Sequence, residues 1–484
     1  MFSDTPLLQP IIPAYHLEVL SQSQLDQLQA ATLEILEQTG VFCPSQKALD
    51  IYAEHGGWVD FERQIVRLSP DVVMEAMAQA PRHYTLGARL GAYDLHLDGK
   101  ALYCATDGCG VETIDFTTRQ RRSSRKEDVG LMARVADYLG AIGFYWPIVS
   151  AQDFLKTAPL HELEASFSNT IKHVQSETVM GEWLAGYAVE MARVINGSEQ
   201  DLRSRPPLSL LVCAIAPLAQ DKEGLESALI FAQAGLPVGF MSMANTGSTA
   251  PATLAGTLVT GDAEIISALV LIQMAYPGAP VFHSLMPGIM HPRTGAYLGT
   301  AWEGTLLYVA GVELAHRWGV PALAGVFGTD AMTPGWQSSG DAASSLLMCA
   351  LAGAETGAGL GLVESCTLLY PEALVLDADV YQRVRIEASG LDTSPEALSL
   401  EVIKQVGPRG HFLAHKHTRM HMRQRQFSEL ACQPHPQGGF REPVQVAREK
   451  TEWILANHHP QPLETGQQLE LKRILAAADQ QEHP

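Results

Sequence analysis

The chain has few basic residues for its length. Its 33 Lys and Arg stand against 53 Asp and Glu in 484 residues, which gives a formal net charge of −20. Binding to nucleic acid needs a basic face that neutralises phosphates, so this composition argues against a nucleic-acid partner. The basic clusters at 119–126 and 419–425 are short and interrupted, and we expect them to lie on solvated faces.

Cysteine is also sparse, with seven residues scattered along the chain and no Cys-x-x-Cys pair. This pattern argues against a disulfide framework and against zinc, and it favours a reducing cytoplasm. No run of about 18 uninterrupted apolar residues is present, so we expect no membrane span. Residues 1–13 lack the pattern of a signal peptide. The 46% hydrophobic content predicts a soluble globular protein with a sizeable core.

Eight short apolar segments recur from residue 101 onward, with starts that are mostly 30 to 45 residues apart, the size of a βα unit. Helical patterns follow each of the first seven. Near-continuous apolar strands alternating with helices predict an α/β fold, a (β/α)8 TIM barrel. The predicted strands are 101–106, 142–150, 171–179, 208–216, 238–244, 281–286, 322–328 and 359–366.

An open, doubly wound sheet is the main alternative to the barrel. That fold places a Gly-x-Gly-x-x-Gly turn after an early strand, and no such turn is present here. The Gly-rich run 357–361 precedes the strand predicted at 359–366, the wrong side for a dinucleotide turn.

Three regions are expected. Residues 1–100 form a mixed α+β cap with a helix at 21–38, a helix start at Ser69-Pro70 and strand-like pieces within 84–97. Residues 101–370 form the barrel. Residues 371–484 form a helical extension packed on the barrel, with helices near 394–405 and 467–478. The exposed tail and the large barrel also predict a homo-oligomer.

The run from Gly247 to Val259 is rich in Gly, Ser and Thr and follows the fifth predicted strand. A strand that ends in such a turn and opens a helix places backbone N–H groups at the rim of the fold. In a (β/α)8 barrel, the C-terminal ends of the strands hold the active site.

Polar, aromatic and thioether residues gather at these strand ends. Such a mixture suits a cationic, methyl-bearing ligand, because aromatic faces attract quaternary ammonium and carboxylates add charge. Trp146, Met243 and Met286 could equally be layer-filling core residues, and the carboxylates could be held by Arg or by backbone N–H groups. The candidates are Asp107, Cys109, Tyr145, Trp146, Gln175, Glu177, Cys213, Met243, Asn245, His283, Met286, Thr329, Asp330, Met332 and Glu364.

Three histidines, His411, His415 and His417, form a cluster after the last predicted strand. The i, i+4 pair could bind a metal from a helix. No carboxylate or Cys stands at a suitable third position, so we expect a structural or partner-facing role and no metal site.

Several ordered blocks of the chain resemble signatures of the trimethylamine methyltransferase family. This resemblance spans nearly the whole sequence and implies a (β/α)8 barrel that moves a methyl group from a methylamine to the cobalt of a corrinoid held by a separate, cognate protein. The blocks are 115–128, 169–172, 216–218, 234–238, 247–264, 277–281, 371–377 and 412–418.

One departure from the family pattern concerns Met332, which follows Thr329-Asp330-Ala331 where the trimethylamine enzymes carry pyrrolysine. A thioether cannot form the covalent amine adduct proposed for pyrrolysine, whereas a quaternary ammonium needs no such activation. The sequence therefore resembles the non-pyrrolysine branch, which demethylates glycine betaine and related quaternary amines. A trimethylamine or other methylamine methyltransferase, or a catalytically silent barrel that binds quaternary amines, remains the alternative.

The resemblance and the strand ends together assign residues to roles. Glu177, Asp330 and Met332 are the expected catalytic residues. The expected substrate-binding residues are Asp107, Tyr145, Trp146, Asn245, His283, Gln337 and Glu364.

Overall fold

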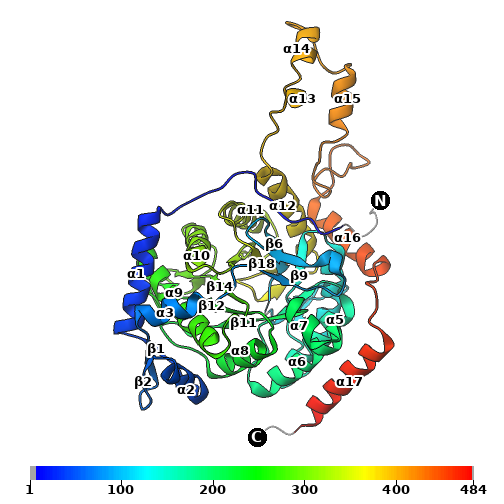
Figure 1. Cartoon of the computed structure of the whole chain (residues 1–484). Coiled ribbons are helices and arrows are strands. Elements are labelled where there is room, and N and C mark those ends of the chain that lie inside the picture. The colour runs from blue at the N-terminus through cyan, green and yellow to red at the C-terminus, as the bar shows by residue number, and fades with distance from the viewer. Residues whose placement is uncertain (1–6, 109, 482–484) are drawn as a thin grey trace.

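A closed barrel of eight parallel strands lies at the centre of the protein, ringed by helices (Figure 1). A computed structural model describes residues 7–108 and 110–481. The strands follow one another around the sheet, and β14 meets β17 through the backbone N–H of His283, which donates to the carbonyl of Pro321 at 2.9 Å. The strands are β6 (Tyr103–Thr106), β9 (Ile142–Tyr145), β10 (His173–Ser176), β11 (Leu208–Cys213), β12 (Val238–Ser242), β14 (Val281–Leu285), β17 (Leu323–Gly325) and β18 (Thr356–Leu360).

All eight predicted strands form, and each is followed by a helix. The eighth helix lies beyond residue 370, so the barrel continues into the segment that we assigned to the extension. The helices are α4 (Lys126–Tyr138), α5 (Ala158–Asn169), α6 (Glu182–Asn196), α8 (Lys222–Ala234), α9 (Leu254–Ala275), α10 (Gly304–Trp318), α11 (Trp336–Leu351) and α12 (Ala373–Ala388), with the short α7 (Glu199–Ser204) after α6.

Residues 357–360 of the Gly-rich run lie within β18 and Gly361 follows its end, so the predicted place of this run before the strand was wrong. Gly359 explains why glycine occurs inside this strand. A Cβ atom there would lie 1.8 Å from the carbonyl oxygen of Val326, and the φ of Gly359 is +138°. The strand can approach Val326 this closely only because Gly359 lacks a side chain.

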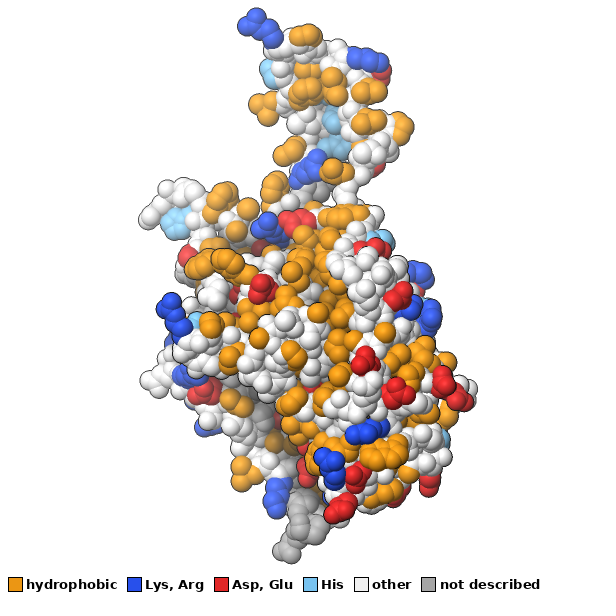
Figure 2. Space-filling view, turned by 90° about the vertical axis from the view of Figure 1, so that its left-hand side faces the viewer, with side chains coloured by type: hydrophobic (Ala, Val, Ile, Leu, Met, Phe, Trp, Pro, Cys, Tyr) orange, Lys and Arg blue, Asp and Glu red, His pale blue; other side chains and the backbone are white. Residues whose placement is uncertain are grey.

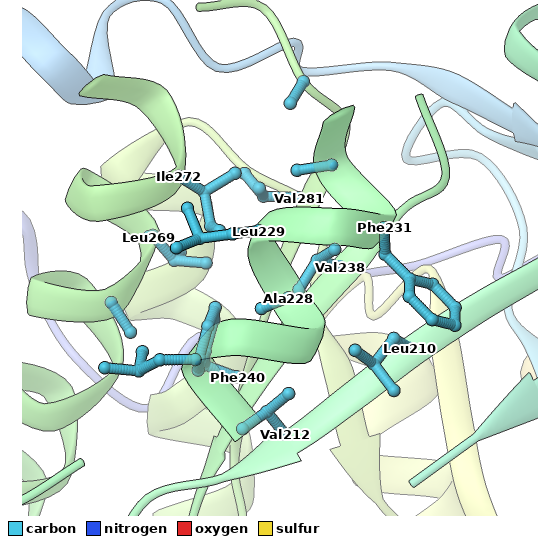
Figure 3. Packing of buried hydrophobic residues seen from close by; sticks show 14 of the residues in the cluster. Leu210, Val212, Ala228, Leu229, Phe231, Val238, Phe240, Leu269, Ile272 and Val281 are labelled. Atoms are coloured by element: carbon cyan, nitrogen blue, oxygen red, sulfur yellow. The ribbon is translucent and has the colours of Figure 1, made fainter. Parts of the chain in front are cut away.

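Side chains alternate along each strand between the lumen and the surrounding helices. The outward residues pack on the helices, as Figure 3 shows for Val212, Phe240 and Val281 beside α8 and α9. The inward residues fill the lumen, among them Phe144, Leu211, Met241, Phe282 and Ala358. The barrel interior is therefore a packed core.

The N-terminal cap forms as a mixed unit on the barrel. Ser21 caps its first helix and Ser69 caps its third, where Pro70 is the first helical residue, as the sequence predicts. The β4–β5 hairpin places Leu86, Leu95 and Leu97 in the lumen core, at the end opposite the mouth. The cap contains α1 (Gln22–Gln38), β1 (Val41–Phe42), α2 (Gln46–Glu54), β2 (Trp58–Asp60), β3 (Ile65–Arg67), α3 (Pro70–Met77), β4 (Tyr84–Leu86), η1 (Gly91–Tyr93) and β5 (Leu95–Leu97).

Short strands from the loops form two small sheets at the mouth. One contains β13 (Asn245–Thr246), β15 (Gly288–Met290) and β16 (Tyr297–Leu298). The other contains β7 (Glu112–Ile114), β8 (Arg121–Ser123), β19 (Leu362–Val363) and β20 (Leu368–Leu369).

The C-terminal extension has two parts. Helices α16 (Pro443–Asn457) and α17 (Thr465–Gln480) pack on the barrel helices, whereas α13 (Pro395–Leu398), α14 (Leu400–Val406) and α15 (Lys416–Met422) project from it (Figure 1). The helix predicted at 394–405 is divided into α13 and α14, because Ser399 adopts a left-handed conformation with φ of +52°.

Helix α9 is long and apolar enough to cross a membrane by length and composition. However, 78% of its apolar window is buried inside the protein. Two acidic residues on this helix, Asp262 and Glu264, are fully buried and hydrogen-bonded. This pattern is typical of a core helix.

Asp262 of α9 joins the cap to the barrel. One carboxylate oxygen pairs with Nε2 of His283 on β14 at 2.9 Å, and the other accepts from the hydroxyl of Thr32 on α1 at 2.7 Å. The indole N–H of Trp318 on α10 donates to the same carboxylate at 3.0–3.1 Å. One buried carboxylate thus satisfies donors from three elements.

Replacing Asp262 with Ala should lower the free energy of unfolding by about 3–5 kcal/mol, because three buried donors lose their acceptor. Asp262→Asn keeps one acceptor oxygen and should lose less. The exposed Glu54→Ala serves as the matched control. Urea denaturation monitored by circular dichroism measures the effect, and equal midpoints for Asp262→Ala and the control would contradict this role.

Candidate active site

Three inward-facing side chains stand at one level of the barrel mouth on adjacent strands. Ala105 of β6 pairs with Phe144 of β9, which pairs with His173 of β10. Two residues further along each strand, Asp107, Trp146 and Gln175 therefore come side by side. A carboxylate, an aromatic ring and an amide thus meet at the top of the packed lumen.

Asp107 is a buried carboxylate with spare hydrogen-bonding capacity. Its Oδ1 accepts from the backbone N–H of Gly108 at 2.9 Å, whereas Oδ2 has no partner among the described residues. The pKa of Asp107 is raised from 3.8 to about 6, mainly by burial and to a smaller extent by the neighbouring Glu177, whereas hydrogen bonds from Cys366 and Gly108 partly offset the rise. A buried carboxylate without a counter-ion is costly, which is typical of a binding site.

The indole of Trp146 lies directly over the backbone of Gly108. A Cβ atom at Gly108 would come within 2.0 Å of the indole, so only glycine allows this contact. The Thr106 hydroxyl fixes the Trp146 backbone, donating to its carbonyl at 2.5 Å and accepting from its N–H at 3.0 Å. The ring therefore has a fixed place beside the Asp107 carboxylate.

Gln175 presents an amide with no hydrogen bond to the described part of the chain. Its side chain is 2% exposed, and its Nε2 is buried without a partner. Neighbouring Ser176 faces the opposite way by strand alternation. Gln175 is consequently a donor available to a ligand in the lumen.

One level higher, Glu177 and Cys213 form a pair. The Cys213 thiol donates to Oε1 of Glu177 at 2.7 Å. Burial and this carboxylate raise the pKa of Cys213 well above its usual value, so the thiol stays protonated and acts as a donor. The bond orients the carboxylate at the mouth.

A second thiol, Cys366, reaches Asp107 from the loop after β19. Residues Glu364, Ser365 and Cys366 all adopt positive φ, between +52° and +68°. Three consecutive non-glycine residues in this region are strained, at a cost of about 1–3 kcal/mol each. The turn places the Cys366 thiol where it donates to the Asp107 carboxylate and keeps a pKa well above its usual value through burial.

Asp330 holds this strained turn in place. It accepts from the Ser365 hydroxyl at 2.6 Å, from the Thr300 hydroxyl at 2.9 Å, and from the backbone N–H groups of Thr300 and Gly299 at 3.1 and 3.3 Å. These contacts tie together the loops that follow β14, β17 and β18. Asp330, an expected catalytic residue, therefore organises the rim.

Tyr297 of β16 is a site residue that the sequence prediction missed. Burial raises the pKa of its hydroxyl, and Cys366, Asp330, Asp107 and Cys213 raise it further, so the ring lies among the mouth residues. It comes from a hairpin that folds over the mouth from the loop after β14. Loop residues of this kind carry no periodic signal in the sequence.

Two residues expected to bind substrate face away from the lumen. The Tyr145 hydroxyl donates to the carbonyl of Val129 on α4 at 2.9 Å, and His283 pairs with Asp262 on α9. Each lies one position from an inward residue, so strand alternation turns both toward the helices. Their predicted place at the mouth was wrong.

The other predicted residues lie around the rim. Glu364 forms an ion pair with Arg121 at 3.0 Å. Asn245 organises the turn at 245–250, where its Nδ2 donates to Ser248 at 2.8 Å. Gln337 is exposed in the first turn of α11, and Met332 is 65% exposed in the preceding loop. The candidate Cys109 lies outside the described residues.

Of the three clustered histidines, His417 lies on the projecting helix α15, His415 caps that helix, and His411 lies in the segment before it (Figure 1). The rings of His417 and His421 have centroids 4.1 Å apart, and His417 contacts the Ser399 hydroxyl at 2.8 Å. Within the described residues, no group of three or more His, Cys, Asp and Glu side chains is arranged to hold a metal ion.

The chain is similar to known proteins along nearly its whole length. The model of the trimethylamine methyltransferase (MTTB) family matches residues 3–482. Trimethylamine methyltransferase MttB of Desulfitobacterium hafniense is 31% identical over 457 residues, covering 93% of this chain and 92% of that protein. Glycine betaine methyltransferase from another strain of the same species is 25% identical over 473 residues, covering 96% and 98%.

A solved structure shares the fold. The monomethylamine methyltransferase of Methanosarcina barkeri matches with a TM-score of 0.52 at 13% identity, covering 93% of this chain and 90% of that one. The predicted (β/α)8 barrel is confirmed.

Replacing Asp107 with Asn should stabilise the protein at neutral pH. Because the pKa of this acid is higher in the folded than in the unfolded state, its ionisation removes stability as the pH rises from about 4 to 6 and above. Asp107→Asn should raise the free energy of unfolding at pH 7 by about 1–3 kcal/mol relative to wild type. Denaturation at pH 4.5 and 7 measures this, with the exposed Asp50→Asn as control. If the free energy of unfolding of Asp107→Asn changed with pH as it does in wild type, Asp107 would not be the group that causes this change.

Proposed function

The chain belongs to the trimethylamine methyltransferase family, and we propose that it transfers a methyl group from a quaternary ammonium compound, similar to glycine betaine, to a corrinoid carried by a cognate protein. The observation that carries this proposal is the buried Asp107 carboxylate with an unpartnered oxygen beside the Trp146 ring. The enzyme class is the methyltransferases of methylated amines.

A quaternary ammonium is the ligand that these two groups fit best. It carries a permanent positive charge but no N–H donor, so it is held by charge and by aromatic faces and not by hydrogen bonds. The carboxylate of Asp107 supplies the charge, and the Trp146 ring supplies the face. A desolvated cation would also offset the cost of keeping Asp107 ionised in the lumen.

The corrinoid supplies the nucleophile that accepts the methyl group. The chain's own residues then bind the ammonium, orient one N-methyl group toward the open mouth and exclude water from the lumen. The amine that leaves a quaternary nitrogen departs neutral, so the chain need not deliver a proton to it. This agrees with a site whose thiols are held protonated by carboxylates.

Met332 favours a quaternary amine over trimethylamine as the substrate. The residue occupies the position of pyrrolysine in the resemblance, and its thioether forms no covalent amine adduct. It is largely exposed on the rim, together with Trp302 and Trp336, which are 98% and 90% exposed. We infer that this apolar rim receives the cognate corrinoid protein, in the cytoplasm.

Gln175 supports a substrate with a polar acceptor near the ammonium. Its unpartnered amide stands one strand from Trp146 and can donate to a carboxylate or hydroxyl oxygen. Glycine betaine carries a carboxylate one carbon from its nitrogen, which makes it the model substrate.

Purified protein should demethylate glycine betaine when it is mixed with a corrinoid protein in the reduced Co(I) state. Methylation of the corrinoid is followed by absorbance, and the demethylated amine is identified by mass spectrometry across a panel of betaines, carnitine, choline and trimethylamine. Asp107→Asn should lower kcat/KM at least about 100-fold through loss of the charge, with Asp50→Asn as control. Wild-type kcat/KM should also fall below pH 6 as Asp107 is protonated.

Turnover of trimethylamine alone would overturn the quaternary assignment. Tight binding of quaternary amines with no methyl transfer to several corrinoid proteins would identify a silent barrel instead.

Gln175→Ala should weaken binding of the carboxylate end of the substrate and leave binding of the ammonium end unchanged. Loss of a hydrogen bond to a charged acceptor costs about 1.5–3 kcal/mol, so the Kd for glycine betaine should rise about 10- to 100-fold. The Kd for tetramethylammonium, which has no acceptor, should stay within about twofold. Calorimetry measures both, with Ser176→Ala as the matched control on the outward face. An equal rise in Kd for the two ligands would mean that Gln175 contributes to the packing of the lumen and does not bind the carboxylate.

A further inference from the structure

Asp377 of α12 is an acid beneath the surface that the substrate contacts above leave unused. It is the last residue of the block 371–377, one of those that carry the family resemblance. On the face shown in Figure 2, charged side chains of both signs are scattered over the surface, in contact with water. Asp377 instead faces the end of β18, where its Oδ2 accepts from the backbone N–H of Gly361 at 2.7 Å. A carboxylate withdrawn from bulk water is costly.

A single peptide unit connects Asp377 to the carboxylate at the top of the lumen. The carbonyl of Leu360 accepts from the backbone N–H of Asp107 at 2.8 Å. The N–H of the same peptide unit, that of Gly361, donates to Asp377. Asp107 and Asp377 therefore hold opposite sides of one peptide, and a displacement of this peptide moves the backbone that carries Asp107.

Asp377 also fixes the start of the segment that brings Cys366 to the site. Gly361 has a φ of +98°, and a Cβ atom there would lie 2.6 Å from Cδ1 of Ile148, so the chain has one path at this point. From Gly361 it continues through β19 into the strained turn that ends at Cys366, whose thiol donates to Asp107. The second support of the Asp107 carboxylate thus begins at the residue that Asp377 holds.

A cavity of about 200 Å³ lies beside Asp377, between the amino ends of α11, α12 and α16. Its polar lining includes the hydroxyls of Thr329, Ser338 and Ser339 and the carboxylate of Glu442, which is exposed and caps α16. None of the described residues that line it is Lys, Arg or His. A polar cavity of this size has room for water, which gives Asp377 a route for its proton that does not cross the lumen.

The guanidinium groups on this side of the barrel pair with other acids. Arg119 binds Glu372 at the start of α12 at 3.0 Å, and Arg121 binds Glu364 in the turn after β19 at 3.0 Å. On α11, the acid near the cavity is Asp341, which accepts from the Thr329 hydroxyl at 2.8 Å. The groups that face Asp377 from α11, α16 and β6 are therefore hydroxyls and acids.

The charges of Asp377 and Asp107 depend on one another. The pKa of Asp377 is raised from 3.8 to about 7, mainly by burial and to a smaller extent by Asp107, whereas the hydrogen bond from Gly361 partly offsets the rise. Each carboxylate opposes ionisation of the other, and a cation beside Asp107 favours ionisation of both.

We propose that Asp377 is a positioning residue and the second acid of the site: it holds the strand end beside Asp107 and adds its own negative charge when a cation enters the lumen. This role rests on the proposed binding of a quaternary ammonium at Asp107. As the cation binds, the neutral carboxyl of Asp377 becomes a carboxylate, and its proton passes through the cavity to the buffer. Asp377 does not touch the ligand, so its charge raises affinity from behind the strand.

Proton release during binding of tetramethylammonium tests this role. Calorimetry at pH 7 in phosphate and in Tris, which differ in ionisation enthalpy, counts the protons. If the cation lowers the pKa of each acid by about one unit, wild type should release about 0.5 proton and Asp377→Asn about 0.1, the remainder coming from Asp107. Asp377→Asn should raise the Kd about fivefold at pH 7 and less than about 1.5-fold at pH 5, where Asp377 is neutral.

Two further variants separate charge from position. Asp377→Asn keeps an acceptor for Gly361, whereas Asp377→Ala removes it and should raise the Kd at pH 5 as well. The exposed Asp50→Asn should keep wild-type proton release and Kd. Circular dichroism establishes that each variant is folded.

Urea denaturation of the ligand-free chain distinguishes failure of this role from failure of the proposed function. Both acids lose stability on ionisation, so at pH 8 Asp377→Asn should raise the urea midpoint, and it should do so by less in an Asp107→Asn background. Equal gains in the two backgrounds would overturn the role, as would proton release that Asp377→Asn leaves unchanged. Unequal gains without binding of any quaternary amine would support the link between the two acids and overturn the proposed function alone.

Discussion

Closure of the eight-stranded barrel is the constraint on which the rest of the structure depends. Once β14 meets β17, each strand has one face toward the lumen and one toward the helices, and no strand can shift by one residue without reversing both faces. Asp262 fixes this arrangement from outside by holding His283, Trp318 and Thr32 together. The inward face then places Asp107, Trp146 and Gln175 on adjacent strands.

The mouth concentrates features that cost stability. Asp107 is buried without a counter-ion, Gln175 lacks a hydrogen-bond partner among the described residues, and three consecutive residues adopt left-handed conformations at Glu364–Cys366. The packed lumen and the Asp330 contacts hold these features in place. Costs of this kind persist where a ligand offsets them, which is the physical reason for our proposal that the ammonium binds here.

The sequence predicted the barrel because its strands are near-continuous apolar segments, and it predicted Asp107, Trp146 and Glu177 because they end such segments. It could not separate Tyr145 from Trp146, since an apolar run long enough for both faces does not reveal which residue faces inward. Tyr297 and Cys366 arrive from loops whose paths depend on tertiary contacts, and Gly359 is explained only by the carbonyl of Val326 beside it.

A crystal structure of the protein with bound glycine betaine tests the central claim most directly. The account predicts the ammonium in the lumen, with its nitrogen within about 6 Å of the centre of the Trp146 ring and facing Oδ2 of Asp107, and its carboxylate at the amide of Gln175. An ammonium bound outside the lumen, or a lumen whose carboxylate and ring do not contact the ligand, would contradict it.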